Sequence, residues 1–402
     1  MTKGQFSTEI IDSTPLHKGE VPKRIIMVGG FLGAGKTTLI RKLAAWLTAK
    51  NLRVGVVTND QGQGLVDTAT MRHGAAEVRE VTGGCFCCQA EALGQELVKM
   101  DAAARPHVFI AEPVGSCTDL VATVLLPMQQ IYPQPLNVAP MSVLVDVARL
   151  ESFMLSERDS GSAGQRKGFA PEVCYIFDKQ LEEAEIIVLN KVDLLTKKRL
   201  IQVEAWLQAK HPDKRILQIS TKTGNGLDAW FALVTETVSM ARRIMEVDYA
   251  KYGAGEERMA WYNATLALHS KNVSYDPNVA LKNLARIIQK DLVTKGAEIA
   301  HFKMSLTNSV SDLREMAVVN CVRNAVPPTL SVRSTVNFLV GELLVNLRAE
   351  AEPELLSRVV ARHLNAPQFN WYVIWKQRAS FKPGQPKPTF RVTNVLSKSE
   401  LL

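Results

Sequence analysis

The sequence predicts an α/β protein whose first domain has a mostly parallel sheet and whose smaller second domain is α+β. Two observations support this fold class. Short apolar, β-branched stretches alternate with stretches that are apolar at helical spacing, as in a parallel sheet covered by helices. Beyond residue 258 this alternation gives way to a half-exposed strand pattern and a long amphipathic helix. The predicted strands of the first domain are residues 24–28, 53–57, 107–111, 142–146, 185–189 and 215–219.

The chain has 402 residues, which is too long for a single hydrophobic core. We expect a loose leader at 1–22, a first domain at 23–243, a polar linker at 244–258, a second domain at 259–364 and a basic, aromatic tail at 365–402. Residues 63–82 are expected to be irregular and partly helical. In the second domain we expect strands at 259–269, 298–307 and 315–323, and helices at 276–295, 335–347 and 353–363.

The composition is that of an ordinary globular protein, with 46% hydrophobic and 22% charged residues. No run of about 18 apolar residues is present, so no transmembrane helix is expected. The polar residues 1–20 lack the apolar core of a secretory signal, and we expect a cytoplasmic protein with no membrane partner. The net charge of +8 is a mild excess without a basic stripe or an aromatic-rich module, so nucleic-acid binding is not expected.

A glycine-rich segment follows the first predicted strand and fits the P-loop pattern G-x-x-x-x-G-K-[ST]. Its glycines let successive backbone N–H groups point inward, and the following helix adds the positive end of its dipole. The segment is therefore predicted to bind the phosphates of a nucleoside triphosphate. Lys36 would reach the β- and γ-phosphates, and the Thr37 hydroxyl would ligate Mg²⁺. The predicted phosphate-binding residues are Gly30, Gly33, Ala34, Gly35, Lys36, Thr37 and Thr38.

Two further strand ends supply carboxylates, at the edge where parallel sheets bind ligands. Glu112 and Gly115 have the layout of a γ-phosphate switch, in which the acid holds Mg²⁺ or its water and the glycine N–H senses the terminal phosphate. Asp60 is a candidate for Mg²⁺, for a second metal or for positioning water, with a capping turn aspartate as the simpler alternative. Together with Lys36, these two acids form the predicted catalytic set.

Three of the six cysteines stand together, at Cys85, Cys87 and Cys88. In a cytoplasmic chain such a cluster favours metal binding over structural disulfides, and a redox switch is the alternative. Thiolates suit Zn²⁺ and also accept Co²⁺, Ni²⁺ or Cu⁺. Three sulfurs leave one tetrahedral position for Asp60, a histidine, water or a target protein, which suits a transferable ion. We expect Cys117 to stay outside this cluster.

The fifth predicted strand ends in the pattern N-K-x-D, at residues 190–193, and this pattern selects guanine. The carboxylate of Asp193 can accept from the ring N1–H and the exocyclic amine, a pair of donors that adenine lacks. Leaving such an acceptor unpaired is costly, so the discrimination has a mechanism. Lys191 would lie along the base, Asn190 would brace the loop, and Ser220 would support the base from the next strand end. GTP with Mg²⁺ is therefore the expected ligand.

Taken together, the P-loop and the C-x-C-C, E-x-x-G and N-K-x-D patterns resemble those of a CobW-type GTPase. This metal-centre and cobalamin-maturation group is related to HypB, UreG and MeaB, and the resemblance is close over residues 23–243. It implies a GTPase that dimerises or binds a partner, and that moves Zn²⁺ or Co²⁺ or services a corrinoid enzyme. It also implies a metal site at Cys85, Cys87 and Cys88 beside an acid, here Asp60 in place of a glutamate. The histidine-rich loop of many members is absent from the sequence, which favours a narrow client relationship.

Three hypotheses follow. The leading one is a GTP-hydrolysing metallochaperone that delivers Zn²⁺ or Co²⁺ to a client metalloenzyme, with release controlled by the nucleotide. The second is a GTP-dependent reactivation chaperone for a cobalamin (corrinoid) enzyme, in which the cysteines act as a sensor. The third is a non-catalytic, nucleotide-dependent scaffold. Co-purification with metal alone favours the first hypothesis, a corrinoid-enzyme partner favours the second, and absence of GTP turnover favours the third.

Overall fold

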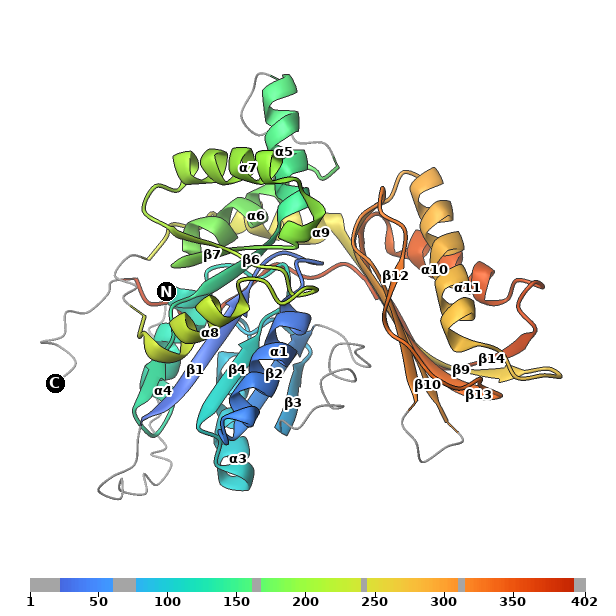
Figure 1. The fold of residues 1–402 in the computed structure, drawn as a ribbon, viewed down its shortest axis with the longest axis horizontal. Helices are drawn as coiled ribbons and strands as arrows, with labels where there is room; N and C mark the ends of the chain where they lie inside the picture. The colour runs from blue at the N-terminus through green and yellow to red at the C-terminus, as the bar shows by residue number, and fades with distance from the viewer. Residues whose placement is uncertain (1–21, 61–76, 161–167, 240–243, 310–314, 394–402) are drawn as a thin grey trace, which may run out of the picture.

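The computed structural model describes residues 22–60, 77–160, 168–239, 244–309 and 315–393, so the predicted leader lies almost wholly outside the described residues. In the described chain, a parallel sheet with helices on both faces is followed by a separate antiparallel sheet (Figure 1). This arrangement confirms the predicted fold class. Among the helices of the described ranges, none combines the length and the apolar character needed to cross a bilayer.

The first domain alternates strands and helices along the chain. Its described elements are β1 (Lys23–Gly29), α1 (Lys36–Ala49), β2 (Val54–Asp60), β3 (Glu77–Thr82), α3 (Ala90–Ala104), β4 (Val108–Glu112), η1 (Val121–Leu125), α4 (Leu126–Ile131), β5 (Leu136–Val138), β6 (Ser142–Asp146), α5 (Val147–Ser160), α6 (Pro171–Glu183), β7 (Ile186–Asn190), η2 (Val192–Leu194), α7 (Lys197–Lys210), β8 (Arg215–Gln218) and α8 (Leu227–Glu236). The strand order is β3-β2-β4-β1-β6-β7-β8, and β5 pairs with the start of β1. Each described pairing is parallel.

The central strand β1 is buried on both of its faces. Ile25 and Met27 pack into a core shared with α3, α4, α5, α6 and α7, whereas Ile26 and Val28 pack into a core shared with α1 and α8. Because both faces are covered, the interior strands β4, β6 and β7 are buried along their whole length and do not alternate. Since the strands are parallel, the loops after β1, β2, β4 and β7 emerge at one edge of the sheet.

The second sheet is antiparallel in every described pairing, with the order β12-β11-β10-β13-β9-β14. Helices α10 and α11 cover one face, where they share a core with the strands. Met259, Trp261 and Ala300 instead join the larger core of the first domain. The described elements of this half are α9 (Tyr249–Arg258), β9 (Met259–Ser270), α10 (Pro277–Thr294), β10 (Glu298–Asn308), β11 (Met316–Cys321), β12 (Thr329–Val332), β13 (Val340–Glu350), α11 (Pro353–Leu364) and β14 (Trp371–Phe381).

Two expected elements are wrong. The helix expected at 335–347 is replaced by β13, an interior strand of the second sheet, between β10 and β9. Leu343, Val345 and Leu347 are buried at every second position, but the leucines give this stretch a helical propensity that the sheet overrides. The irregular stretch expected up to residue 82 ends in β3, a strand paired with β2, whose charged residues mask its pattern.

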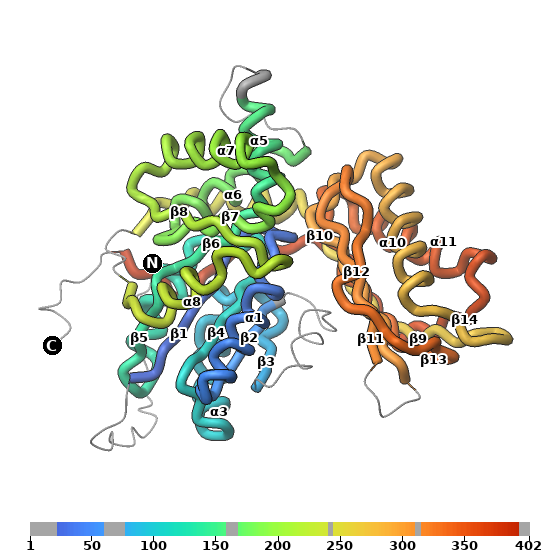
Figure 2. Tube along the Cα trace, viewed as in Figure 1, coloured from blue at the N-terminus to red at the C-terminus, as the bar shows by residue number. Residues whose placement is uncertain are grey.

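The linker and tail segments also carry structure. The expected linker contains α9, which packs against α6, and Gly255 lies so close that a Cβ there would be 2.5 Å from the carbonyl oxygen of Glu172. The tail supplies β14, which pairs with β9, and residues 382–393 then return to the first domain (Figure 2). The chain therefore ends its described course against the domain in which it began. The exact domain boundaries stay predictions.

Candidate functional site: a phosphate loop joined to a thiol cluster

The loop between β1 and α1 has the backbone that its glycines permit. Gly30, Gly33 and Gly35 have φ values of 124°, 78° and 104°, which L side chains rarely adopt. At Gly30 a Cβ would lie 2.2 Å from the carbonyl oxygen of Leu144, so the loop is packed directly on β6. Lys36 begins α1 and donates through Nζ to the carbonyl oxygen of Gly30, 2.8 Å away. The arrangement places a lysine and a helix N-terminus together, which suits a phosphate group.

The predicted Mg²⁺ residues meet at the ends of α1 and β4. Thr37 Oγ1 donates to Oε1 of Glu112 at 2.9 Å, and Glu112 is buried at the carboxyl end of β4. Thr38, the next residue of α1, is half-buried. Gly115 packs against the P-loop, since a Cβ there would lie 2.7 Å from Cδ2 of Leu32. A hydroxyl and a carboxylate in contact provide hard oxygen ligands of the kind that Mg²⁺ takes.

The structure places Asp60 at the carboxyl end of β2, where its backbone pairs with Thr82 of β3. Its side chain lies outside the described part of the chain. The neighbouring Asn59 has a defined role, because its Nδ2 donates to the carbonyl oxygens of Val81 and Gly84, at 3.0 and 2.7 Å. Its Oδ1 accepts from the backbone N–H of Phe86 at 2.7 Å. The strand that carries Asp60 is thereby tied to the loop that carries the cysteines.

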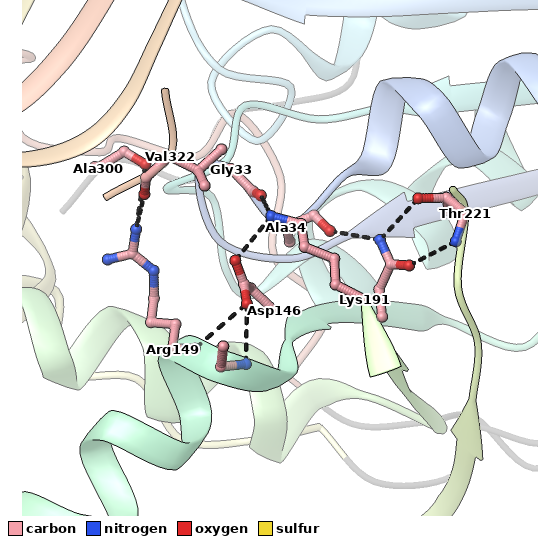
Figure 3. Close-up of polar contacts among 10 residues, drawn as sticks. Gly33, Ala34, Asp146, Arg149, Lys191, Thr221, Ala300 and Val322 are labelled. Carbon is pink, nitrogen blue, oxygen red and sulfur yellow. Dashed lines mark hydrogen bonds and ion pairs between the residues drawn. The ribbon is translucent and has the colours of Figure 1, made fainter. Parts of the chain in front are cut away.

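The N-K-x-D segment braces the phosphate loop from the side of β7 (Figure 3). Asn190 is fully buried, donates to the carbonyl oxygen of Ala34 at 2.8 Å and accepts from the backbone N–H of Thr221 at 3.0 Å. Lys191 has a φ of 65°, and its Nζ lies 2.7 Å from the carbonyl oxygen of Gly33 and 2.8 Å from Oδ2 of Asp146. The structure therefore joins two of the predicted nucleotide motifs directly.

Asp193, the acid predicted to bind the guanine base, is exposed, and a hydrogen bond from Ser220 holds its carboxylate in place. Ser220 Oγ donates to Oδ1 of Asp193 at 2.6 Å and accepts from the backbone N–H of Thr223 at 3.1 Å. Burial alone would raise the pKa of Asp146, but its ion pair with Lys191 holds that pKa below the usual value. Asp146 thus stays ionised behind the loop and holds Lys191 through this ion pair. Asp193, by contrast, is the exposed carboxylate of the two.

Arg149 connects this site to the second sheet, and no motif in the sequence indicated this contact. It is buried in α5 and donates through Nη2 to the carbonyl oxygens of Ala300 and Val322, at 3.3 and 2.5 Å (Figure 3). A Cβ on Gly33 would lie 3.0 Å from the same oxygen of Ala300. The tip of the P-loop therefore lies against the second sheet, and the loop has contacts on both sides.

A cluster of thiols lies beside this site. The Sγ atom of Cys85 is 2.8 Å from that of Cys87 and 3.3 Å from that of Cys88, while Cys87 and Cys88 are 3.9 Å apart. Against expectation, Cys117 belongs to the cluster, because the sulfurs of Cys85, Cys87 and Cys117 all lie within 4.8 Å of one another. The prediction that Cys117 stays outside was wrong, since the sequence does not show which way the loop after β4 turns.

The chemistry of this cluster suits a soft metal ion. Hydrogen bonds from Cys117, Cys87 and Cys88 lower the pKa of Cys85 well below its usual value. Tetrahedral thiolates at about 2.3 Å from Zn²⁺ would be about 3.8 Å apart. The separations among Cys85, Cys87 and Cys88 are 2.8, 3.3 and 3.9 Å, and Cys117 lies within 4.8 Å of Cys85 and Cys87. Cys85, Cys87 and Cys117 are buried, and Cys88 is half-buried at the rim. The donor set therefore fits a zinc-type ion.

The segment that joins the two sites is Glu112–Cys117, and it is fixed by α6. Gln180 in α6 is buried and donates through Nε2 to the carbonyl oxygens of Gly115 and Cys117, at 3.0 and 2.8 Å. The backbone N–H of Cys117 donates to the carbonyl oxygen of Val114 at 2.9 Å, which makes a tight turn. One amide side chain thus holds Gly115, the predicted phosphate-switch glycine, and Cys117 together.

The chain's C-terminal segment covers the rim of the thiol cluster. The backbone N–H of Lys387 donates to Sγ of Cys88 at 3.2 Å, and the N–H and Oγ1 of Thr389 donate to the carbonyl oxygens of Cys87 and Cys88, at 3.1 and 2.9 Å. Arg391 donates through Nε to Oδ2 of Asp119 at 2.7 Å. The tail is therefore bound along the loops that carry the cysteines.

The fold and the site define a nucleotide-binding domain of the P-loop class. Residues 24–218 match the model of the CobW/HypB/UreG nucleotide-binding domain. The match covers most of the first domain and agrees with the resemblance that the motifs indicated.

Among its relatives, the chain is similar to the zinc chaperone CobW of Sinorhizobium sp, with 28% identity over 191 residues, or 44% of this chain and 53% of the relative. It is similar to the zinc chaperone YeiR of Escherichia coli K12, with 26% identity over 200 residues, or 48% and 54% of the two chains. The chain thus spans about half the length of the curated relatives it matches. A crystal structure of HypB from Helicobacter pylori in complex with nickel aligns with 18% identity and a TM-score of 0.37, over 53% of this chain and 85% of that one.

We expect Asn190→Ala to weaken nucleotide binding by at least about tenfold, because it leaves a buried carbonyl and a buried N–H without their partner at about 1–3 kcal/mol each. The readout is titration with a fluorescent guanine nucleotide, alongside thermal unfolding. Asn225→Ala, at an exposed position in the same region, is the matched control and should change neither. An unchanged nucleotide affinity in Asn190→Ala would contradict the bracing role.

Proposed function

We propose that this protein is a GTP-hydrolysing metallochaperone that carries a metal ion, Zn²⁺ first, to a client metalloprotein and releases it under control of the nucleotide. The observation that carries the proposal is the buried segment Glu112–Cys117. Its first residue contacts Thr37 of the P-loop, and its last residue lies in the thiol cluster. A change at the terminal phosphate can therefore reach the metal site through six residues of one chain.

In this proposal each group of residues has a separate task. The P-loop from Gly30 to Thr38 holds the phosphates, and Thr37 and Glu112 hold Mg²⁺. Asp193, supported by Ser220, reads the guanine base. Asp60 and Glu112 position the γ-phosphate and the attacking water, while Lys36 stabilises the charge that develops there.

The metal-binding role is assigned to Cys85, Cys87 and Cys88, with a fourth position for which Asp60 is the candidate from the sequence. Zinc is favoured because thiolates are soft ligands and because the relatives are zinc chaperones. Thiolates also bind Co²⁺, but they favour it less than Zn²⁺. A site that binds metal tightly does not release it unaided, so hydrolysis would supply the difference in affinity between two states.

Asp193→Asn should lower the affinity for GTP by about 10- to 100-fold, because the amide offers only one acceptor to the two donors of guanine. Xanthosine triphosphate should gain affinity, since it carries a carbonyl where guanine carries the amine. Competition binding of GTP, ATP and xanthosine triphosphate measures the shift. Asp213→Asn, at an exposed acid paired with Lys214, is the control. A variant that still prefers GTP would exclude Asp193 as the base reader.

Cys87→Ser should lower zinc affinity by at least about tenfold while GTP binding is unchanged, because one metal–sulfur bond is lost and none of the proposed nucleotide-binding residues is altered. The measurement is competition with a chromophoric zinc chelator, with guanine-nucleotide titration in parallel. Cys321→Ser removes a buried thiol of the second sheet and should behave as the unmodified protein. Equal zinc affinity of Cys87→Ser and the unmodified protein would refute the metal-binding assignment.

A further inference from the structure

Cys117 is a residue that neither the motifs nor the family match assigns to any role, yet its thiol has a specific environment. It is 2% exposed, and its sulfur lies within 4.8 Å of those of Cys85 and Cys87. A second buried thiol in the same domain shows the contrast: Cys174 donates to the carbonyl oxygen of Phe169, at 3.7 Å. Cys117 therefore faces other sulfurs, whereas Cys174 occupies the position of an ordinary buried cysteine.

We propose that Cys117 is the fourth ligand of the transferred metal, in the position for which the sequence offered Asp60. Cys85, Cys87 and Cys117 then form a buried face of three thiolates, and Cys88 completes a tetrahedron of four sulfurs from the rim. This inference rests on the proposed function, because it assumes that the cysteines bind a metal. Moving the sulfurs of Cys85 and Cys87, now 2.8 Å apart, to a separation of about 3.8 Å requires about 1 Å of adjustment. Cys88 lies outside the group of sulfurs that are all within 4.8 Å of one another, so its sulfur also has to approach that of Cys117 when the metal binds.

Two hydrogen bonds hold the backbone around Cys117 in place, as is usual for residues that bind a metal. Gln180 fixes its carbonyl oxygen, and the N–H of the next residue, Thr118, donates to the hydroxyl of Tyr252 at 3.3 Å. Tyr252 is buried in α9. Side chains of α6 and α9 therefore hold the backbone that carries the Cys117 thiol, and this thiol is directed toward the cluster. Such outer supports orient ligands at metal sites and are worth about 10- to 100-fold in metal affinity.

The four ligands come from two loops, and this division assigns them different roles. Cys85, Cys87 and Cys88 belong to the loop between β3 and α3, and Cys117 belongs to the loop after β4. Only Cys117 shares a segment with Glu112, five residues earlier. Cys88 is half-buried and lies under the backbone N–H of Lys387. Cys88 is thus the ligand that an incoming client thiol would exchange first, once residues 387–389 of the tail move aside.

The decisive test compares the unmodified protein, Cys117→Ser and the matched control Cys174→Ser, each with zinc and with Co²⁺ as the spectroscopic probe. We expect Cys117→Ser to bind zinc at least about tenfold more weakly and its thiolate-to-Co²⁺ absorption to fall, while Cys174→Ser matches the unmodified protein. Guanine-nucleotide binding by each variant reports whether the first domain is folded. Unchanged zinc affinity and Co²⁺ absorption in Cys117→Ser would overturn the proposal.

X-ray absorption on the zinc-loaded, unmodified protein provides a test that does not depend on a variant. Four sulfur scatterers support the proposal, whereas three sulfurs with one oxygen or nitrogen overturn it and favour a carboxylate such as Asp60. The two levels of the account fail separately. If the unmodified protein binds no zinc, the proposed function fails. If it binds zinc through three sulfurs and Cys117→Ser binds zinc equally well, only the assignment of Cys117 fails.

Discussion

The candidate site depends on one constraint: the segment Glu112–Cys117, at the end of β4, is buried and held by Gln180 of α6. Both ends of this segment carry polar chemistry, yet every residue of it is buried. Gln180 makes that possible, because it satisfies two carbonyl oxygens that would otherwise be costly to bury. The contact of Glu112 with Thr37 and the place of Cys117 among the thiols both follow from this restraint. A short, closely packed segment transmits a displacement from one end to the other better than an exposed loop.

The second sheet is part of the same arrangement. Arg149 donates to the carbonyl oxygen of Ala300 in β10 and to that of Val322, just after β11. The tip of the P-loop lies against β10, and the chain that leaves β14 returns to cover Cys88. Each of the two sites on the first domain therefore touches the C-terminal half of the chain. The predicted nucleotide site, the thiol cluster and the covering tail are therefore connected by direct contacts, although they are far apart in sequence.

The features that could be predicted from the sequence are those that depend on residues close together in the chain. The glycines of the P-loop, the acid at the end of β4 and the N-K-x-D loop all depend on strand ends in a parallel sheet, and the apolar runs predicted those strands. The sequence did not predict Cys117, Arg149 or the tail contacts, because these depend on which distant segments pack together. The same reason explains β13, where alternate burial of Leu343, Val345 and Leu347 in the second sheet overrides a leucine-rich, helix-like composition.

The central claim is that the nucleotide state sets the metal affinity through the segment Glu112–Cys117. The most direct measurement is the zinc affinity of the unmodified protein, determined by chelator competition in saturating GDP and in a saturating, non-hydrolysable GTP analogue with Mg²⁺. The account predicts tighter zinc binding with the GTP analogue, by about 5- to 150-fold as for a coupling of 1–3 kcal/mol. Equal zinc affinities in the two nucleotide states would contradict it.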